Sequence, residues 1–190
     1  MNEPKKLIDT PSQTAGPFLH IGCAPRITGI NIFKSELGLT PFQDISDNEA
    51  INIKGKIYDG NKEPIIDAMI ETWQCDANGN YSSNQGFARI VTDFKTGEYQ
   101  LKTIRPGNKI NTNGSLSASY ITFWIVARGM NRPLITRMYF LENDLKNDLI
   151  LNSIKIEDRL NTLIPYTEDK KNFVFDIHLQ GKKETIFFEF

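Results

Sequence analysis

The side chains in this sequence that could do chemistry are few and far apart. Its two histidines, His20 and His178, are separated by most of the chain, so we expect no histidine-rich metal centre within one polypeptide. A lone histidine on a strand or loop usually serves as a hydrogen-bonding residue. Tyr81 follows an Asn-Gly turn, where it could cover the edge of the core or act as a phenolate ligand. The residues alone favour the first role.

Familiar catalytic motifs are missing from the sequence. There is no glycine pattern for nucleotide binding, no Gly-x-Ser-x-Gly and no cysteine–histidine pair at a catalytic spacing. The carboxylates are scattered, and no pair stands out for acid–base catalysis. Cys23 and Cys75 form no metal or redox motif, so we expect two free thiols in a reducing compartment. These observations predict a soluble β-sandwich domain without a self-sufficient catalytic site.

Composition excludes several other classes of protein. The chain has 190 residues, with 22 Lys and Arg against 23 Asp and Glu, and this balance argues against nucleic-acid binding. No apolar run approaches the length of a membrane span. Residues 1–10 lack the apolar core of a signal peptide. We therefore expect a single cytoplasmic domain.

One stretch, Ser119–Gly129, organises the rest of the chain. It contains no internal Gly or Pro and is rich in β-branched and aromatic residues, which is typical of a central strand. One face is wholly apolar and should lie in the core: Ile121, Phe123, Ile125 and Ala127. The other face is mixed and should look at something polar: Tyr120, Thr122, Trp124, Val126 and Arg128.

The other elements follow from alternation and turn signals. Strands are expected at 51–57, 69–75, 88–94, 98–104, 134–140, 173–179 and 185–190. Those at 88–94 and 98–104 should form a hairpin. One or two short helices are expected near residues 143–163. Prolines and glycines in 10–22 predict an extended loop without a helix. The predicted fold is an all-β antiparallel sandwich over residues 51–190, preceded by an arm and irregular segment over 1–50.

Several ordered segments together resemble a known family. They are Thr10–Gly22, Tyr58–Gly60, Glu71–Tyr81, Thr103–Gly107, Ala127–Gly129, Thr136–Phe140, Phe175–Gly181 and Glu184–Phe188. The resemblance covers nearly the whole chain and is to the α-chain family of protocatechuate 3,4-dioxygenases, which are intradiol ring-cleaving enzymes. It implies a heteromer of α and β chains. In that family the β chain holds Fe(III) with two tyrosines and two histidines, while the α chain helps to wall the active site.

The positions that correspond to the iron ligands can be compared one by one. The resemblance places them at Tyr81, near Lys109, and at Tyr120 and Thr122. One tyrosine ligand is present, but the other is replaced by lysine and neither histidine stands here. A phenol and a hydroxyl cannot supply a Fe(III) site, so we expect this chain to bind no metal. Tyr120 departs further from the family, whose α chains often keep a histidine there, and the segment between Tyr81 and Arg89 looks shorter.

The resemblance also implies a contribution to the partner's active site. The wall would be formed by Thr14, Gly16, Pro17 and Phe18, and the last of these stands where a tyrosine is common. A Gly-Pro turn gives a rigid backbone that can approach a flat ring closely.

Arg128 would supply a positive charge for the anionic substrate. It lies about 20 Å along the strand from Thr122, too far to serve this chain's own former centre, so it should act at a neighbouring chain's site. The alternative is an ordinary surface ion pair at a strand end.

Three functions remain open. The chain could be the α subunit of a dioxygenase that converts protocatechuate and O₂ to 3-carboxy-cis,cis-muconate. It could belong to a related heteromer that acts on another catechol acid, since Phe18 and the shortened segment depart from the family. It could also have drifted to a binding or scaffolding role without catalysis.

Overall fold

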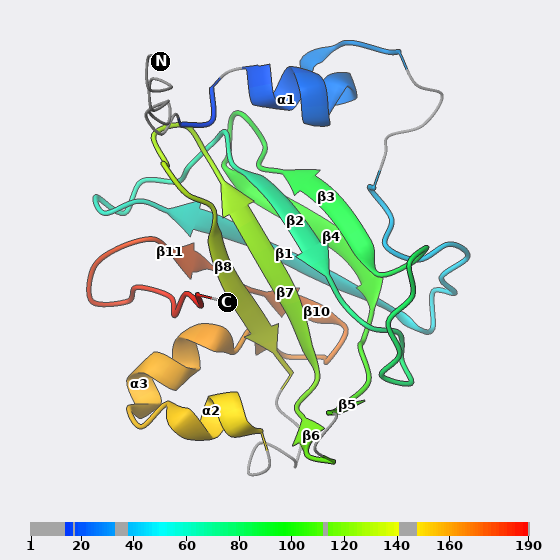
Figure 1. Ribbon diagram of the computed structural model, residues 1–190. Coiled ribbons are helices and arrows are strands. Elements are labelled where there is room, and N and C mark those ends of the chain that lie inside the picture. Colours follow the sequence, from blue (N-terminus) through cyan, green and yellow to red (C-terminus); the bar gives the residue numbers. More distant parts are fainter. Residues whose placement is uncertain (1–13, 17, 33–37, 112–113, 141–147, 190) are drawn as a thin grey trace, which may run out of the picture.

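The computed structural model describes residues 14–16, 18–32, 38–111, 114–140 and 148–189. Two sheets stack face to face, and the helices lie at the two ends of the stack (Figure 1). The first sheet contains β1 (Ala50–Tyr58), β4 (Glu98–Ile104), β9 (Tyr166–Thr167), β10 (Asn172–Val174) and β11 (Ile177–His178). The second contains β2 (Met69–Trp73), β3 (Phe87–Val91), β7 (Tyr120–Val126) and β8 (Leu134–Tyr139). A small ribbon pairs β5 (Lys109–Ile110) with β6 (Leu116–Ser117).

The predicted β-sandwich is confirmed, and most of its strand pairs are antiparallel. β1 is the exception, because it pairs in parallel with β10 and β11. The order of the second sheet is β3-β2-β7-β8, so β7 lies inside it, between two neighbours.

The predicted division of the two faces of β7 is also confirmed. The four apolar side chains on its core face are at most 1% exposed: Ile121, Phe123, Ile125 and Ala127. They pack in one cluster with residues from both sheets, so β7 forms the middle of the core. The residues of its other face within β7 are all half-buried, and Arg128 just beyond it is exposed. This arrangement exposes a mixed surface for contacts outside the core.

A close approach between β1 and the C-terminal segment interrupts the strand expected at 173–179. A Cβ on Gly55 would lie 2.0 Å from the carbonyl oxygen of Phe175. That carbonyl accepts a hydrogen bond from the hydroxyl of Tyr99, which is fully buried. Immediately after it, the Oδ1 of Asp176 accepts from the Lys56 amide at 2.9 Å. Because a side-chain bond replaces a backbone bond here, the segment divides into β10 and β11.

Two other strand predictions were wrong. β3 and β4 do not form a hairpin, because β4 pairs with β1 in the opposite sheet. Residues 185–189 form no strand, although the Phe188 amide donates to the Ile135 carbonyl at 2.7 Å. Single bonds of this kind hold the segment beside β8 without building a ladder.

The helices lie at the edges of the sandwich. α1 (Phe18–Cys23) and the 3₁₀ turn η1 (Pro25–Thr28) lie at one end, against the expectation of a helix-free loop. The prolines at 11 and 17 precede the helix and therefore do not exclude it, since proline is tolerated before or within a first turn.

The short helices expected near 143–163 are confirmed as α2 (Leu149–Ser153), α3 (Glu157–Leu160) and the 3₁₀ turn η3 (Asn161–Leu163). Residues 143–147 lie outside the described residues. Asp148 caps α2 by accepting from the amides of Ile150 and Leu151, and its other oxygen accepts from Ala118 at 2.9 Å. This buried carboxylate ties α2 to the segment that leads into β7.

Candidate functional site

The positions matched to iron ligands meet near the start of β7. The hydroxyls of Tyr81 and Tyr120 lie 3.4 Å apart. The Nζ of Lys109 lies 5.1 Å from the centre of the Tyr81 ring, and the Cζ of Arg137 lies 4.2 Å from that of Tyr120. We call Tyr81, Lys109, Tyr120 and Arg137 the tyrosine–cation cluster. Thr122 stands beside it, paired in register with Arg137 across β7 and β8.

The side chains of this cluster do not match the donor set of a ferric site. Desolvation, followed by the hydrogen bond to Tyr120, raises the pKa of Tyr81. Burial thus opposes the phenolate form that a ferric ligand takes. Two cationic side chains lie on the tyrosine rings where a metal centre would need anionic or neutral donors. The residues present do not fit Fe(III), and the described residues contain no group of three His, Cys, Asp or Glu side chains that could hold a metal ion.

Arg137 is the member of this cluster that sequence reasoning missed. Its Nη1 donates to the hydroxyl of Tyr139 at 3.3 Å, and its Cζ also lies 5.7 Å from the ring of Phe188. Burial raises the pKa of Tyr139 to about 12, against the lowering effect of Arg137. Arg137 lies in the segment 136–140 that carries the family resemblance, but the register that pairs it with Thr122 comes from the structure and not from the sequence.

The residues expected to serve a partner's site gather near the other end of β7. Ala15 forms a parallel β-bridge with Arg128, so Thr14 and Gly16 flank the backbone beside that arginine. The Nε of Arg128 donates to the Oδ2 of Asp67. Phe18 opens α1 and is 77% exposed. Pro17 lies outside the described residues.

His20, in α1, lies close enough to Asp67 and Arg128 to be affected by both charges. It is 5% exposed and packs edge-on against Phe94, with ring centres 5.4 Å apart. Its Nε2 has no hydrogen-bond partner among the described residues. Desolvation lowers the pKa of His20; the Asp67 carboxylate opposes this shift, and the Arg128 guanidinium adds to it.

We call Asp67, Arg128 and the segment Thr14–Gly16 the arm cluster.

The side chain of Arg89, on β3, also anchors the arm. The Nη1 of Arg89 donates to the carbonyl of Cys23 at 3.3 Å, while its Nε donates to Glu71 at 2.8 Å. Figure 1 shows α1 above the end of the sandwich that is opposite the β5–β6 ribbon. The arm cluster and the tyrosine–cation cluster therefore lie at opposite ends of β7.

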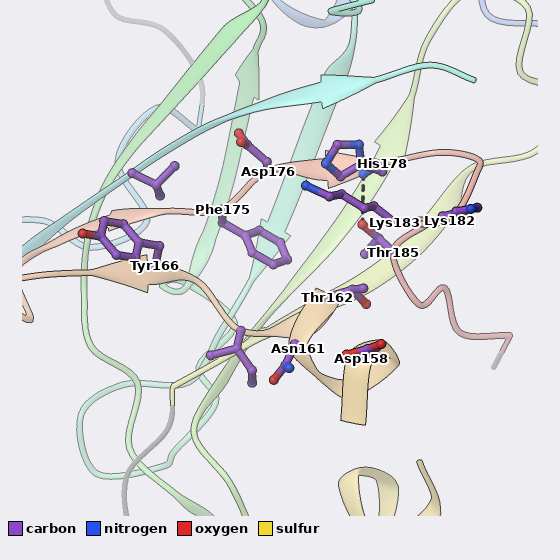
Figure 2. A pocket seen from close by; sticks show the side chains of 12 residues that line it. Asp158, Asn161, Thr162, Tyr166, Phe175, Asp176, His178, Lys182, Lys183 and Thr185 are labelled. Atoms are coloured by element: carbon purple, nitrogen blue, oxygen red, sulfur yellow. Dashed lines mark hydrogen bonds between the residues drawn. The ribbon is translucent and has the colours of Figure 1, made fainter. Parts of the chain in front are cut away.

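A separate hollow of about 510 Å³ lies between the C-terminal segment and the short helices (Figure 2). Lys182 and Lys183 lie along it together with Asp158 and Asp176, so its charges balance. His178 lines it and stacks on Tyr58 with ring centres 4.9 Å apart. None of the predicted site residues lines this hollow.

The expectation that both cysteines are free thiols is confirmed, with Cys75 buried and Cys23 half-buried.

Comparison with protein families defines the class. The sequence profile of the family described as "Dioxygenase" matches residues 34–181 of this chain. The fold agrees, since catechol 1,2-dioxygenase from Pseudomonas arvilla C-1 superposes with a TM-score of 0.59 at 19% identity, over 75% of this chain and 55% of that one. The chain belongs to the intradiol ring-cleaving dioxygenase family.

Within that family, the chain aligns from end to end with α chains. It is 37% identical to the protocatechuate 3,4-dioxygenase α chain of Pseudomonas putida, over 97% of this chain and 98% of the relative. It is 30% identical to the α chain of Burkholderia cepacia, over 96% and 98% of the two chains.

No helix among the described residues is long and apolar enough to cross a membrane.

Proposed function

We propose that this chain is the α-type subunit of a heteromeric protocatechuate 3,4-dioxygenase in the cytoplasm. The observation that carries this proposal is the full-length similarity to two α chains of that enzyme. The tyrosine–cation cluster supports it, because the four side chains of that cluster do not form a donor set for the iron that such chemistry uses. In this proposal Fe(III) belongs to a homologous β chain, where it activates the bound catechol towards O₂.

The role proposed for this chain is to bind and orient the substrate at the partner's site. Protocatechuate carries a carboxylate, and Arg128 offers a planar cation that can pair with it through two parallel hydrogen bonds. Residues Thr14–Phe18 would form the wall against the flat ring. The β-bridge between Ala15 and Arg128 supports this proposal, since it brings the arm and the charge to one place.

Two alternatives remain on the same fold. Phe18 is the predicted wall residue that departs from the family, so a different catechol acid is the second candidate. A binding role without catalysis is the third, but a scaffold would have no need to keep Arg128 next to the arm.

Iron content and O₂ uptake test the proposal. This chain is purified alone and co-expressed with a β chain of the same family, and each preparation is assayed with protocatechuate. Iron and activity in the complex but not in the isolated chain are expected. Iron and activity in the isolated chain would overturn the assignment of the chemistry to the partner. Chains that fail to associate would instead favour the binding role.

Substitution of Arg128 tests its assignment directly. In the active complex, Arg128→Ala should raise the KM for protocatechuate while iron content stays unchanged. Since hydrogen bonds to a charged partner contribute about 1.5–3 kcal/mol, the rise should be at least about tenfold. An unchanged KM would remove Arg128 from the site.

A further inference from the structure

The two side chains of the ion pair between Arg128 and Asp67 differ in how far they are exposed to solvent, and this difference bears on substrate binding. The side chain of Arg128 is 60% exposed, whereas that of Asp67 is 15% exposed. The carboxylate is thus a fixed, mostly buried group, and the guanidinium extends from it towards solvent. An ordinary surface ion pair would have both partners exposed, as in the pair of Lys102 and Asp47 at 51% and 95%.

Asp67 is held in place by the sheet. Its neighbour Ala68 is fully buried, and the Ala68 amide donates to the hydroxyl of Thr92 at 3.0 Å. The Thr92 amide returns a bond to the Ala68 carbonyl at 2.9 Å. β2 and β7 pair with Met69 opposite Val126, and continuing this antiparallel register places Asp67 opposite Arg128. The carboxylate therefore sits at a defined point beside the arginine backbone.

The contact uses one edge of the guanidinium and leaves the other available. Arg128 donates to Asp67 through Nε, and its two terminal amino groups have no partner among the described residues. A guanidinium presents its donors in a planar fork, and the edge formed by the two terminal groups matches a carboxylate. Anchoring Nε therefore orients the fork without consuming the edge that an anionic ligand would use.

We infer that Asp67 is a positioning residue that orders Arg128 for the carboxylate of the substrate. This inference rests on the proposed function, because it requires Arg128 to contact substrate bound at the partner's site. Asp67 touches no reacting atom. Its contribution is to remove rotamer freedom from an exposed arginine before the substrate arrives.

The test uses the active α–β complex and two substrates, protocatechuate and catechol, which lacks the carboxylate. Asp67→Ala should raise the KM for protocatechuate about two- to twelvefold, the affinity equivalent of ordering one long side chain. Both kcat and the KM for catechol should stay unchanged. Asp67→Asn keeps an oxygen acceptor for Nε, so its KM for protocatechuate should stay within about twofold of the value for the unmodified complex. Asp47→Ala removes a matched exposed aspartate and should change neither substrate's KM.

The outcomes separate this inference from the proposed function. If Arg128→Ala leaves the KM for protocatechuate unchanged, the assignment of Arg128 fails and the role of Asp67 fails with it. If Arg128→Ala raises that KM but Asp67→Ala leaves it unchanged or lowers it, only the positioning role is wrong. A lowered KM would mean that Asp67 competes with the substrate for the arginine. The double variant should match Arg128→Ala alone, and an additive loss would contradict action through Arg128.

Assembly must be checked for each variant, since Asp67 is mostly buried. Size-exclusion chromatography of the complex gives that control. If Asp67→Ala does not assemble, Asp67→Glu carries the test, because the added methylene displaces the guanidinium but keeps the charge. A rise in the KM for protocatechuate alone is expected, and equal KM values for Asp67→Glu and the unmodified complex would overturn the inference.

Discussion

Arg137→Met tests whether the guanidinium holds together the tyrosine–cation cluster. Methionine keeps a long apolar side chain over Tyr120 but removes the charge and the donors. The substitution therefore removes contacts of the guanidinium, among them the stacking on Tyr120 at 4.2 Å and the hydrogen bond to the Tyr139 hydroxyl at 3.3 Å. Both contacts lie on the side of the sheet away from the main core.

The expected loss follows from these contacts. A cation stacked on an aromatic ring contributes about 0.5–2 kcal/mol, with the lower end for exposed pairs, and Arg137 and Tyr120 are both half-buried. A hydrogen bond from a charged donor contributes about 1.5–3 kcal/mol, and its 3.3 Å length places this one at the lower end. Since the two terms are not fully additive, the free energy of unfolding should fall by about 2–3 kcal/mol.

Urea unfolding of the full-length chain, followed by circular dichroism, measures this loss. Arg132→Met is the matched control, because Arg132 is exposed on the turn between β7 and β8 and should change stability by less than about 0.5 kcal/mol. Equal effects of the two substitutions would refute the role given to the guanidinium. Tyr139→Phe in both backgrounds completes a cycle, and a coupling near zero would show that the hydrogen bond contributes nothing.

Three further predictions concern the first sheet and the two histidines. Tyr99→Phe leaves the Phe175 carbonyl without its buried donor, and urea unfolding should show a loss of about 1–3 kcal/mol. Gly55→Ala places a methyl group 2.0 Å from that same carbonyl oxygen, so hydrogen exchange at the Phe175 amide should accelerate; unchanged protection would contradict the close approach. Burial lowers the pKa values of His20 and His178 below 6.5, so the unfolded chain binds more protons and stability should fall as pH drops below about 6.5. Replacing both histidines with glutamine should flatten this dependence.

Local pattern was enough to predict the centre of the fold. The alternation in β7 assigned its buried face correctly, because a period of two is a property of the strand itself. The errors in the strands arose where distant segments meet. Gly55 meets Phe175 across the first sheet and interrupts a strand whose sequence alternates without a break. The helix α1 was missed because its prolines precede it and do not interrupt it.

The candidate site shows the same limit. Tyr120 and Thr122 belong to one strand, so their place on the same face could be predicted from their spacing. Arg137 and Asp67 could not, because each reaches its partner across a strand register that the sequence leaves open. Arg137 lies on β8 and Asp67 in the turn just before β2, and only the pairing of β7 with β2 and β8 brings them to their positions.

The two ends of β7 use arginine in opposite ways. At the start of β7, the face of the Arg137 guanidinium lies on the Tyr120 ring, and one of its terminal nitrogens donates to Tyr139. Both the face and that nitrogen are therefore engaged within the fold. At the other end, Asp67 holds Arg128 by Nε and leaves the terminal edge exposed beside the arm. A carboxylate arriving from outside needs the terminal edge of a guanidinium and room to approach it. The arm end of β7 meets both requirements, which is why substrate recognition is proposed there and structural support at the positions matched to iron ligands.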